Sequence, residues 1–378
     1  MANTIYLDCA AHMPAEKEVL DAFCAAECAG NPSSLHALGR QAKAIMDGAT
    51  ASIAGILGVK PEEIIFTSGA SESNNLAIKG FARAGRYTGK HIISTPLEHP
   101  SVSGALTFLQ EQGHEIDLLH VKRNGEADTE HLRELLRKDT ALVALTAVDS
   151  ELGAVQPVAE IANILKEYPN CRFHVDAAQA VGKIPFDFHL ADSVSVSPHK
   201  FGGICGSGML YKREKTVLEP LIHGGASTTI YRSGTPAVSL AVSAAKALEL
   251  ALGGMDDALR HVQTLQNLLR GVLGQYPLVR VNSPENAVPH ILNLSVKGVK
   301  GEVFQKMIDD HGVCVSVKSA CSVPNTPSRA VFAVSRDKSN ALCSWRISMS
   351  RRTTQEEIME FLRIFDHVYK ESAHETRA

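Results

Sequence analysis

The sequence between about residues 36 and 215 alternates between helical patterns and short runs of apolar, mostly β-branched residues. Small and apolar residues recur at helical spacing from 36 to 57 and stop at Gly58, and a second helical pattern covers 71–84. This alternation favours an α/β fold with a mostly parallel sheet covered by helices on both faces. Ligands bind such sheets beyond the carboxyl ends of the strands. The expected strands are 63–67, 91–94, 116–119, 142–145, 172–175 and 193–197.

The rest of the chain is typical of a long helical connection and a smaller α+β unit. Residues 236–276 are strongly helical with a break at Gly253–Gly254. The pattern then predicts strands at 291–294, 313–316 and 345–348 and helices at 301–311 and 354–369. We therefore expect a large domain at 15–250 and a small domain formed by 1–14 and 251–378.

Composition narrows the class of protein. The chain has 378 residues, of which 44% are hydrophobic and 21% charged, as in ordinary globular proteins. A formal net charge of -3 gives no electrostatic argument for binding nucleic acid or an anionic membrane. The N-terminus lacks a signal-peptide pattern, and no apolar run approaches the ~20 residues of a membrane span. We expect a cytoplasmic protein.

Eight cysteines in a chain of this length do not indicate a disulfide framework. Cys24 and Cys28 are four residues apart on a probable helix, but no further Cys or His nearby completes a metal site. We expect no metal among the functional residues.

Asp176 and Lys200 follow two consecutive expected strands, and Lys200 precedes a glycine turn. A buried carboxylate and an amine brought together at strand ends suit pyridoxal phosphate (PLP). The Lys forms the Schiff base, and the Asp keeps the pyridine nitrogen protonated so that the ring accepts electrons. Taken singly, the two residues could instead be a capping Asp and a surface Lys.

Residues 67–75 follow a strand and open a helix. Small hydroxyl residues and free backbone N–H groups at a helix N-terminus form an anion site, here for the cofactor phosphate. Simple N-capping by Ser71 is the alternative. Near the same strand ends, the flat ring of His99 could stack on a pyridine, or it could be a hydrogen-bonded loop residue. Gln179 could reach the ring hydroxyl.

Two further regions carry candidate residues. Cys321 lies in a loop rich in Ser, Pro and Asn, which predicts an exposed, mobile thiol that is used in chemistry; a buried structural Cys is the alternative. Arg346 lies inside a half-buried strand and should have a carboxylate partner, either a ligand or an internal Asp or Glu. The loops 30–36 and 232–236 each enter a helix and could bind anions or serve as plain caps.

Together these residues resemble the cysteine desulfurases, the NifS-like group of the class V, fold-type I PLP enzymes. The similarity runs from about residue 5 to about residue 365 in the same order. The matching segments are 6–11, 30–36, 67–75, 98–99, 151–157, 174–183, 197–203, 232–235, 319–321 and 346–348.

The resemblance implies a role for each candidate residue. Lys200 would carry PLP and shuttle a proton, and Cys321 would take sulfur from the substrate as a persulfide. Arg346 and Asn31 would fix the substrate carboxylate. Thr235 would reach the phosphate of the neighbouring subunit, which implies a homodimer. The remaining cofactor contacts would be made by Ala70, Ser71, His99, Ser150, Asp176, Gln179, Ser197 and His199.

The resemblance also implies a seven-stranded, mostly parallel sheet in the large domain and a long, mobile cysteine loop between Cys321 and Arg346. Three departures from the NifS-like pattern stand out. Asp149–Ser150 replaces the usual Asn-Asn, and we expect this change to alter ring electronics and substrate binding. Lys318 replaces a Gly and could lower the pKa of Cys321 if the loop brings them together. His12 stands where Thr is usual.

The function expected from the resemblance is removal of sulfur from L-cysteine, giving L-alanine and a Cys321 persulfide for transfer to an acceptor protein. An iron–sulfur scaffold and a thiolation enzyme are both candidate acceptors. One alternative is a selenocysteine lyase or another PLP-dependent β-lyase. A second is a PLP-bound sulfur-relay scaffold with little turnover.

Overall fold

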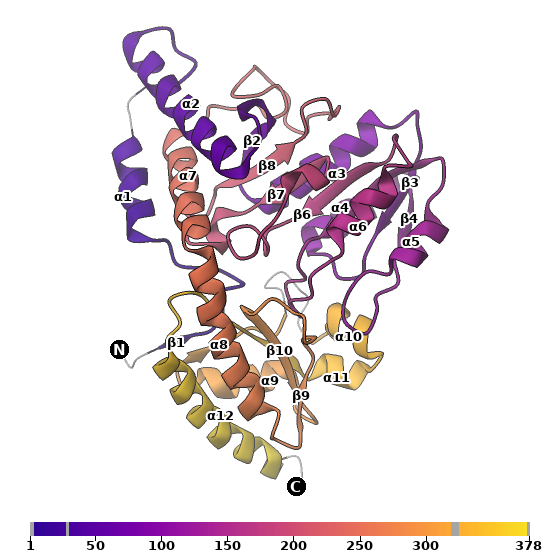
Figure 1. Cartoon of the computed structure of the whole chain (residues 1–378), viewed down its shortest axis with the longest axis vertical. Helices are drawn as coiled ribbons and strands as arrows, with labels where there is room; N and C mark the ends of the chain where they lie inside the picture. Colours follow the sequence, from indigo (N-terminus) through magenta and orange to yellow (C-terminus); the bar gives the residue numbers. More distant parts are fainter. Residues whose placement is uncertain (1–3, 28–29, 319–324, 376–378) are drawn as a thin grey trace.

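The computed structural model describes residues 4–27, 30–318 and 325–375. Figure 1 shows a large twisted sheet with its helices in the upper part of the molecule and a smaller unit beneath it. Helices α7 (Val238–Gly253) and α8 (Met255–Leu273) run from one part to the other. Within the described part of the chain, no individual helix has the length and apolar composition to span a bilayer. Only α7 and α8 taken together have that length and composition, and the pair is bent by 64° at its junction.

The large sheet has the seven strands that the resemblance implied, and their order is β2-β8-β7-β6-β5-β3-β4. All neighbours pair in parallel except β8, which is antiparallel to both β2 and β7. The strand order reverses between β3 and β5, which in such sheets opens a crevice at the carboxyl ends. The strands are β2 Ile64–Thr67, β3 His91–Ser94, β4 Glu115–Leu118, β5 Thr140–Thr146, β6 Arg172–Asp176, β7 Ser193–Val196 and β8 Gly208–Lys212.

Strand β5 shows why this sheet is buried on both faces. Its side chains alternate between faces, so Leu142 and Ala144 join one apolar core while Val143 and Leu145 join the other. Helices α3 and α4 cover the first face, and α2, α6 and α7 contribute to the second core. The helices of this part are α1 Lys17–Ala26, α2 Ala37–Leu57, α3 Ala70–Ala84, α4 Pro100–Glu111, α5 Thr129–Leu135 and α6 Val158–Leu165.

The smaller unit contains a three-stranded antiparallel sheet of order β12-β10-β9 and a parallel pair of β1 with β11. Ile5 and Leu7 of the N-terminal segment are buried in its core, beside Trp345 and Phe365. The division into two domains at 15–250 stays a prediction. The remaining elements are β1 Ile5–Tyr6, β9 Val279–Val281, β10 Ile291–Val296, β11 Val313–Cys314, β12 Ser344–Ser348, α9 Gly301–Asp309 and α12 Gln355–Glu375.

The stretch between Cys321 and Arg346 was expected to have the length of a long cysteine loop, and part of it is helical: α10 (Arg329–Ser335) and α11 (Lys338–Leu342) form there. Their alanines and Val331 are buried against Leu97 and Leu152 of the large unit. Two helices of five and seven residues are marginal on their own, so this contact rather than helix propensity stabilises them.

Candidate active site

A pocket of about 420 Å³ lies at the carboxyl ends of the large sheet. Residues that follow β2, β3, β5, β6 and β7 line it, together with the N-terminal segment and β12. The structure thus brings together side chains that lie far apart in the sequence. The predicted site residues around this pocket are Ala70, Ser71, His99, Ser150, Asp176, Gln179, Ser197, His199, Lys200 and Arg346.

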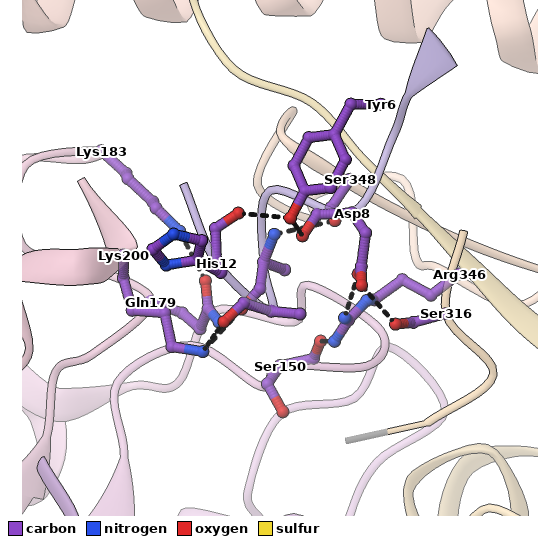
Figure 2. Close-up of polar contacts among 12 residues, drawn as sticks. Tyr6, Asp8, His12, Ser150, Gln179, Lys183, Lys200, Ser316, Arg346 and Ser348 are labelled. Carbon is purple, nitrogen blue, oxygen red and sulfur yellow. Dashed lines mark hydrogen bonds and ion pairs between the residues drawn. The ribbon is translucent and has the colours of Figure 1, made fainter. Parts of the chain in front are cut away.

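Lys200 ends a short 3₁₀ turn, η3 (Pro198–Lys200), that follows β7. Its Nζ donates hydrogen bonds to the carbonyl oxygens of Ala10 and Ala11, at 2.9 and 2.8 Å (Figure 2). The N-terminal segment therefore fixes where the amine sits in the pocket.

Asp176 ends β6 and is 5% exposed. One carboxylate oxygen accepts from the side-chain amide of Asn74 at 2.7 Å, and the other accepts from the backbone N–H of Ala178 at 3.0 Å. The oxygen of the Asn74 side chain is 3.0 Å from Nε2 of His174. Burial lowers the pKa of His174 to about 4, so its ring is neutral at ordinary pH and donates from Nε2. These bonds hold the carboxylate in a fixed orientation.

The sequence patterns did not single out Asn74 or His174 as functional. Asn74 stood inside the expected phosphate motif and His174 inside the strand that precedes Asp176, but the residues they contact lie elsewhere in the sequence. Asn74 is 102 positions from Asp176. Only the packing of α3 on the sheet brings them together.

His99 precedes α4 and caps it, because its Nδ1 accepts from the backbone N–H of Ser101 at 3.1 Å. The Ser101 hydroxyl lies 2.8 Å from the same nitrogen and accepts from Asn74 at 2.8 Å. Burial lowers the pKa of His99, and the Lys200 charge acts in the same direction while Asp176 opposes them. A neutral, flat ring is therefore fixed at the pocket wall by Ser101, which is itself hydrogen-bonded to the Asn74 amide that holds Asp176.

Helix α3 starts at Ala70, and no described side chain caps its first turn. Its N-terminal amides therefore remain available for an anion at the pocket wall. The turn before it packs closely on the start of β8: a Cβ added at Gly208 would lie 2.4 Å from the Cα of Gly69. This cradle of backbone amides fits a phosphate group.

Gln179 lines the pocket, but both ends of its amide are already hydrogen-bonded inside the protein. Its Nε2 donates to the carbonyl oxygen of Ala10 at 2.9 Å, and its Oε1 accepts from Lys183 at 2.6 Å. Burial, followed by the charge of Lys200, lowers the pKa of Lys183 to about 7. A second buried amine that titrates near neutrality therefore lies close to the site, and the sequence patterns did not predict it.

Arg346 is 2% exposed and has the internal carboxylate partner that was one of the two expectations for it. It forms an ion pair with Asp8 at 2.9 Å, donates to the carbonyl oxygen of Ser150 at 2.7 Å, and also lines the pocket. Asp8 in turn accepts a hydrogen bond from Ser316 at 2.7 Å (Figure 2). An internal partner thus positions a guanidinium at the pocket wall.

The two residues of the substituted pair Asp149–Ser150 lie in different environments. Ser150 lines the pocket, whereas Asp149 is 1% exposed and is absent from the described lining. One Asp149 oxygen accepts from the backbone N–H groups of Glu151 and Leu152, and burial raises the pKa of this carboxyl to about 7. Asp149 therefore stabilises the turn after β5. Its buried position behind the pocket does not favour a direct contact with the cofactor ring or the substrate.

Glu98 is a second buried carboxyl behind the pocket. One of its oxygens accepts from the Thr95 hydroxyl at 2.6 Å and from the backbone N–H of Thr146 at 3.1 Å. The other oxygen has no hydrogen-bond partner among the described residues. Burial is the largest cause that raises the pKa of Glu98 to about 8, and the charges of Asp176 and Asp149 act in the same direction.

Three predicted residues are not in this pocket as the structure describes it. Asn31 is exposed in the connection between α1 and α2, and Thr235 is exposed ahead of α7. Cys321 lies outside the described residues. Lys318, the last described residue before it, donates from Nζ to the carbonyl oxygen of Thr326 at 2.7 Å. The roles expected for Asn31, Thr235 and Cys321 stay predictions.

Comparison with known proteins relates this arrangement to a family. Residues 5–361 match the family model described as aminotransferase class-V. The chain is 39% identical over 375 residues to a cysteine desulfurase IscS of Dictyoglomus turgidum, covering 97% of this chain and 95% of that protein. It is 40% identical over 364 residues to a mitochondrial cysteine desulfurase of Arabidopsis thaliana, covering 94% of this chain and 80% of that protein.

The fold is similar to that of a solved NifS-like protein. The two structures superpose with a TM-score of 0.91 at 32% sequence identity, over 98% of this chain and 100% of that one.

Proposed function

Since the chain belongs to the class-V aminotransferase family and is a cysteine desulfurase of its NifS-like group, we propose that Lys200 and Asp176 hold pyridoxal phosphate in the pocket at the sheet's carboxyl edge. The observation that carries this proposal is the fixed carboxylate of Asp176 in the same pocket as the Lys200 amine. The uncapped first turn of α3 supplies amides for the phosphate, and the neutral ring of His99 offers a face for stacking. The residues present therefore fit this cofactor.

Bound pyridoxal phosphate supplies an electron sink for the bonds that break in an amino-acid substrate. Asp176 keeps a proton at the ring nitrogen, and Asn74 prevents the carboxylate from turning away. Lys200 holds the cofactor and later carries protons at its Nζ. Ser197 and His199 flank this lysine and contact the phosphate.

Arg346 binds the carboxylate of L-cysteine, and Asn31 assists it. The ion pair with Asp8 keeps the guanidinium from collapsing into the pocket and aligns its fork. Gln179 contacts the ring oxygen of the cofactor when its side-chain amide gives up the hydrogen bond to the Ala10 carbonyl. Ser150 lies next to the substrate.

Cys321 accepts the sulfur. The substrate carbon–sulfur bond breaks, a sulfur–sulfur bond forms on the Cys321 thiol, and the substrate leaves as L-alanine. Atoms and electrons balance without an added oxidant, because the thiol and L-cysteine together give a persulfide and L-alanine. The persulfide then passes to an acceptor protein. We place this chemistry in the cytoplasm.

The homodimer is supported by exposed apolar side chains in the two loops that also carry Thr235 and Asn31. Leu35 is 90% and Ile230 is 74% exposed. Pro32 and Ser33 of one loop and Ser227, Thr228 and Pro236 of the other line one common hollow, so the two loops lie on the same face of the chain. Burying this face against a second copy would remove large apolar side chains from water and bring Thr235 to the partner's phosphate.

The function is tested by giving the purified, cofactor-loaded protein L-cysteine and a thiol reductant and measuring L-alanine and sulfide. Equal amounts of both products are expected. Pyruvate and ammonia in place of L-alanine would identify a β-eliminating lyase.

The dimer is tested separately by sedimentation. Ile230→Glu should produce monomers. Met359→Glu, which changes another exposed apolar side chain, on α12, should leave the dimer intact. A wild-type protein that sediments as an active monomer would contradict the shared site.

A further inference from the structure

His12, His199 and Cys205 bring three metal-binding atoms together at the edge of the Lys200 pocket. The two histidine Nδ1 atoms are 3.4 Å apart. The Cys205 sulfur lies 3.5 Å from Nδ1 of His12 and 3.6 Å from Nδ1 of His199. The three residues come from different segments: the turn after β1, the η3 turn and the glycine-rich turn before β8.

Hydrogen bonding alone does not account for this closed triangle. A thiol donates one proton, and a neutral imidazole carries one N–H in total. If the thiol donates to one histidine, that Nδ1 is an acceptor, and the other histidine can donate to only one of the two remaining atoms. At most two of the three contacts are then satisfied. A cation at the centre of the triangle would satisfy all three.

The separations match those between ligands of tetrahedral zinc. Bond lengths of about 2.05 Å to nitrogen and about 2.3 Å to sulfur give tetrahedral edges of about 3.3 Å for N–N and about 3.6 Å for N–S. The measured distances agree with these edges within about 0.1 Å. Two imidazoles and one thiolate are also ligands that zinc favours.

The cluster is accessible to a metal ion from solution. Cys205 is exposed and both histidines are partly exposed. Three protein ligands leave the fourth tetrahedral position open, the arrangement of zinc sites that keep an exchangeable water. Cys205 and His199 both line the pocket that contains Lys200, so this fourth position is next to that pocket.

We propose that His12, His199 and Cys205 form a zinc site beside the Lys200 pocket. On binding, the Cys205 thiol loses its proton to solvent and a zinc–sulfur bond forms, with no change in oxidation state. The NifS-like pattern has Thr at position 12, so the site is a feature of this chain and goes beyond the proposed desulfurase function. Bound zinc would tie the segment that holds the Lys200 amine, through Ala10 and Ala11, to the turn that carries Lys200.

The test uses the cofactor-loaded protein with a Cys321→Ser background, so that the loop thiol contributes no ligand. Cobalt(II) is added first, because a tetrahedral thiolate site gives it intense visible bands. Zinc is then added in competition with a chromophoric chelator to obtain its affinity and stoichiometry. One site per chain is expected, and bound zinc should raise Tm because it binds the folded chain.

Cys205→Ser and His12→Thr should each abolish the cobalt bands. They should weaken zinc binding by more than the roughly 10- to 100-fold that loss of an outer-shell partner costs. Cys24→Ser, an exposed cysteine on α1, is the matched control and should bind as the background protein does.

Unchanged cobalt spectra and zinc affinity in both Cys205→Ser and His12→Thr would overturn the proposal. So would the absence of tetrahedral cobalt bands in the background protein. Neither outcome depends on whether the enzyme desulfurates cysteine, so failure of this site is distinguishable from failure of the proposed function.

Discussion

Replacing Arg346 by Lys separates the two roles that its position supports. The guanidinium makes two charge-assisted hydrogen bonds inside the protein, to Asp8 and to the Ser150 carbonyl, and its pocket-facing part is proposed to bind the substrate carboxylate (Figure 2). A lysine keeps the charge but cannot present a planar fork.

The magnitude follows from the loss of one charged hydrogen bond to the substrate. Such a bond contributes ~1.5–3 kcal/mol, which corresponds to a rise of roughly 10- to 150-fold in KM for L-cysteine. Initial rates of L-alanine formation over a range of L-cysteine concentrations measure it. Cysteamine lacks the carboxylate, so its half-saturating concentration, read from the cofactor absorbance, should be nearly the same for the two proteins.

Ser316→Ala is the matched control, because it removes the side-chain hydrogen bond to Asp8 and keeps both the Arg346 side chain and the backbone bonds between residues 316 and 346. It should lower Tm and leave KM close to the wild-type value. A lowered Tm with an unchanged KM for Arg346→Lys would show that Arg346 serves only as an internal ion pair, and the substrate role would be refuted.

Three further outcomes are expected. Lys200→Ala should lose borohydride-fixed PLP, whereas Lys183→Ala, which removes the neighbouring buried amine, should keep it; peptide mass spectrometry that finds the cofactor on Lys183 would reverse the assignment. Cys321→Ser should bind L-cysteine but form no L-alanine, while Cys205→Ser should still carry extra sulfur on the Cys321 peptide; wild-type L-alanine formation by Cys321→Ser would exclude the persulfide route. Glu98 binds its proton more tightly in the folded chain than in the unfolded chain, so its contribution to stability is complete below the ordinary Glu pKa and is lost as the pH rises to about 8. Glu98→Gln should therefore flatten the fall of Tm over that range, and parallel Tm–pH curves for the two proteins would show that this carboxyl is not the cause.

Local sequence determined most of the large sheet. The strand pattern at 91–94 coincides with β3, and the helical pattern that stops at Gly58 coincides with α2, which ends there in the left-handed conformation at φ 68°. These features depend on side-chain alternation and on glycine at a helix end, which are properties of neighbouring residues. For the same reason the sequence patterns alone assign Asp176 and Lys200 to strand ends.

Strand β8 and helices α10 and α11 were not predicted. The five residues of β8 are buried on both faces and follow a glycine-rich turn, so they show no alternating pattern. The helices α10 and α11 depend on contacts with Leu97 and Leu152, far away in the sequence. Tertiary packing decided the conformation of these segments.

Tertiary structure alone decided which polar groups meet. Asn74 reaches Asp176 across 102 positions, Asp8 reaches Arg346 across 338, and His12 reaches His199 across 187. A sequence pattern extends over a helix turn or a strand, whereas a side-chain contact requires two elements to be placed within a few ångströms of each other. The sequence by itself therefore determined the family of the chain and the candidate residues for its chemistry. Folding decided how those residues are held, and it created the His12–His199–Cys205 cluster because three separate turns meet at one edge of the pocket.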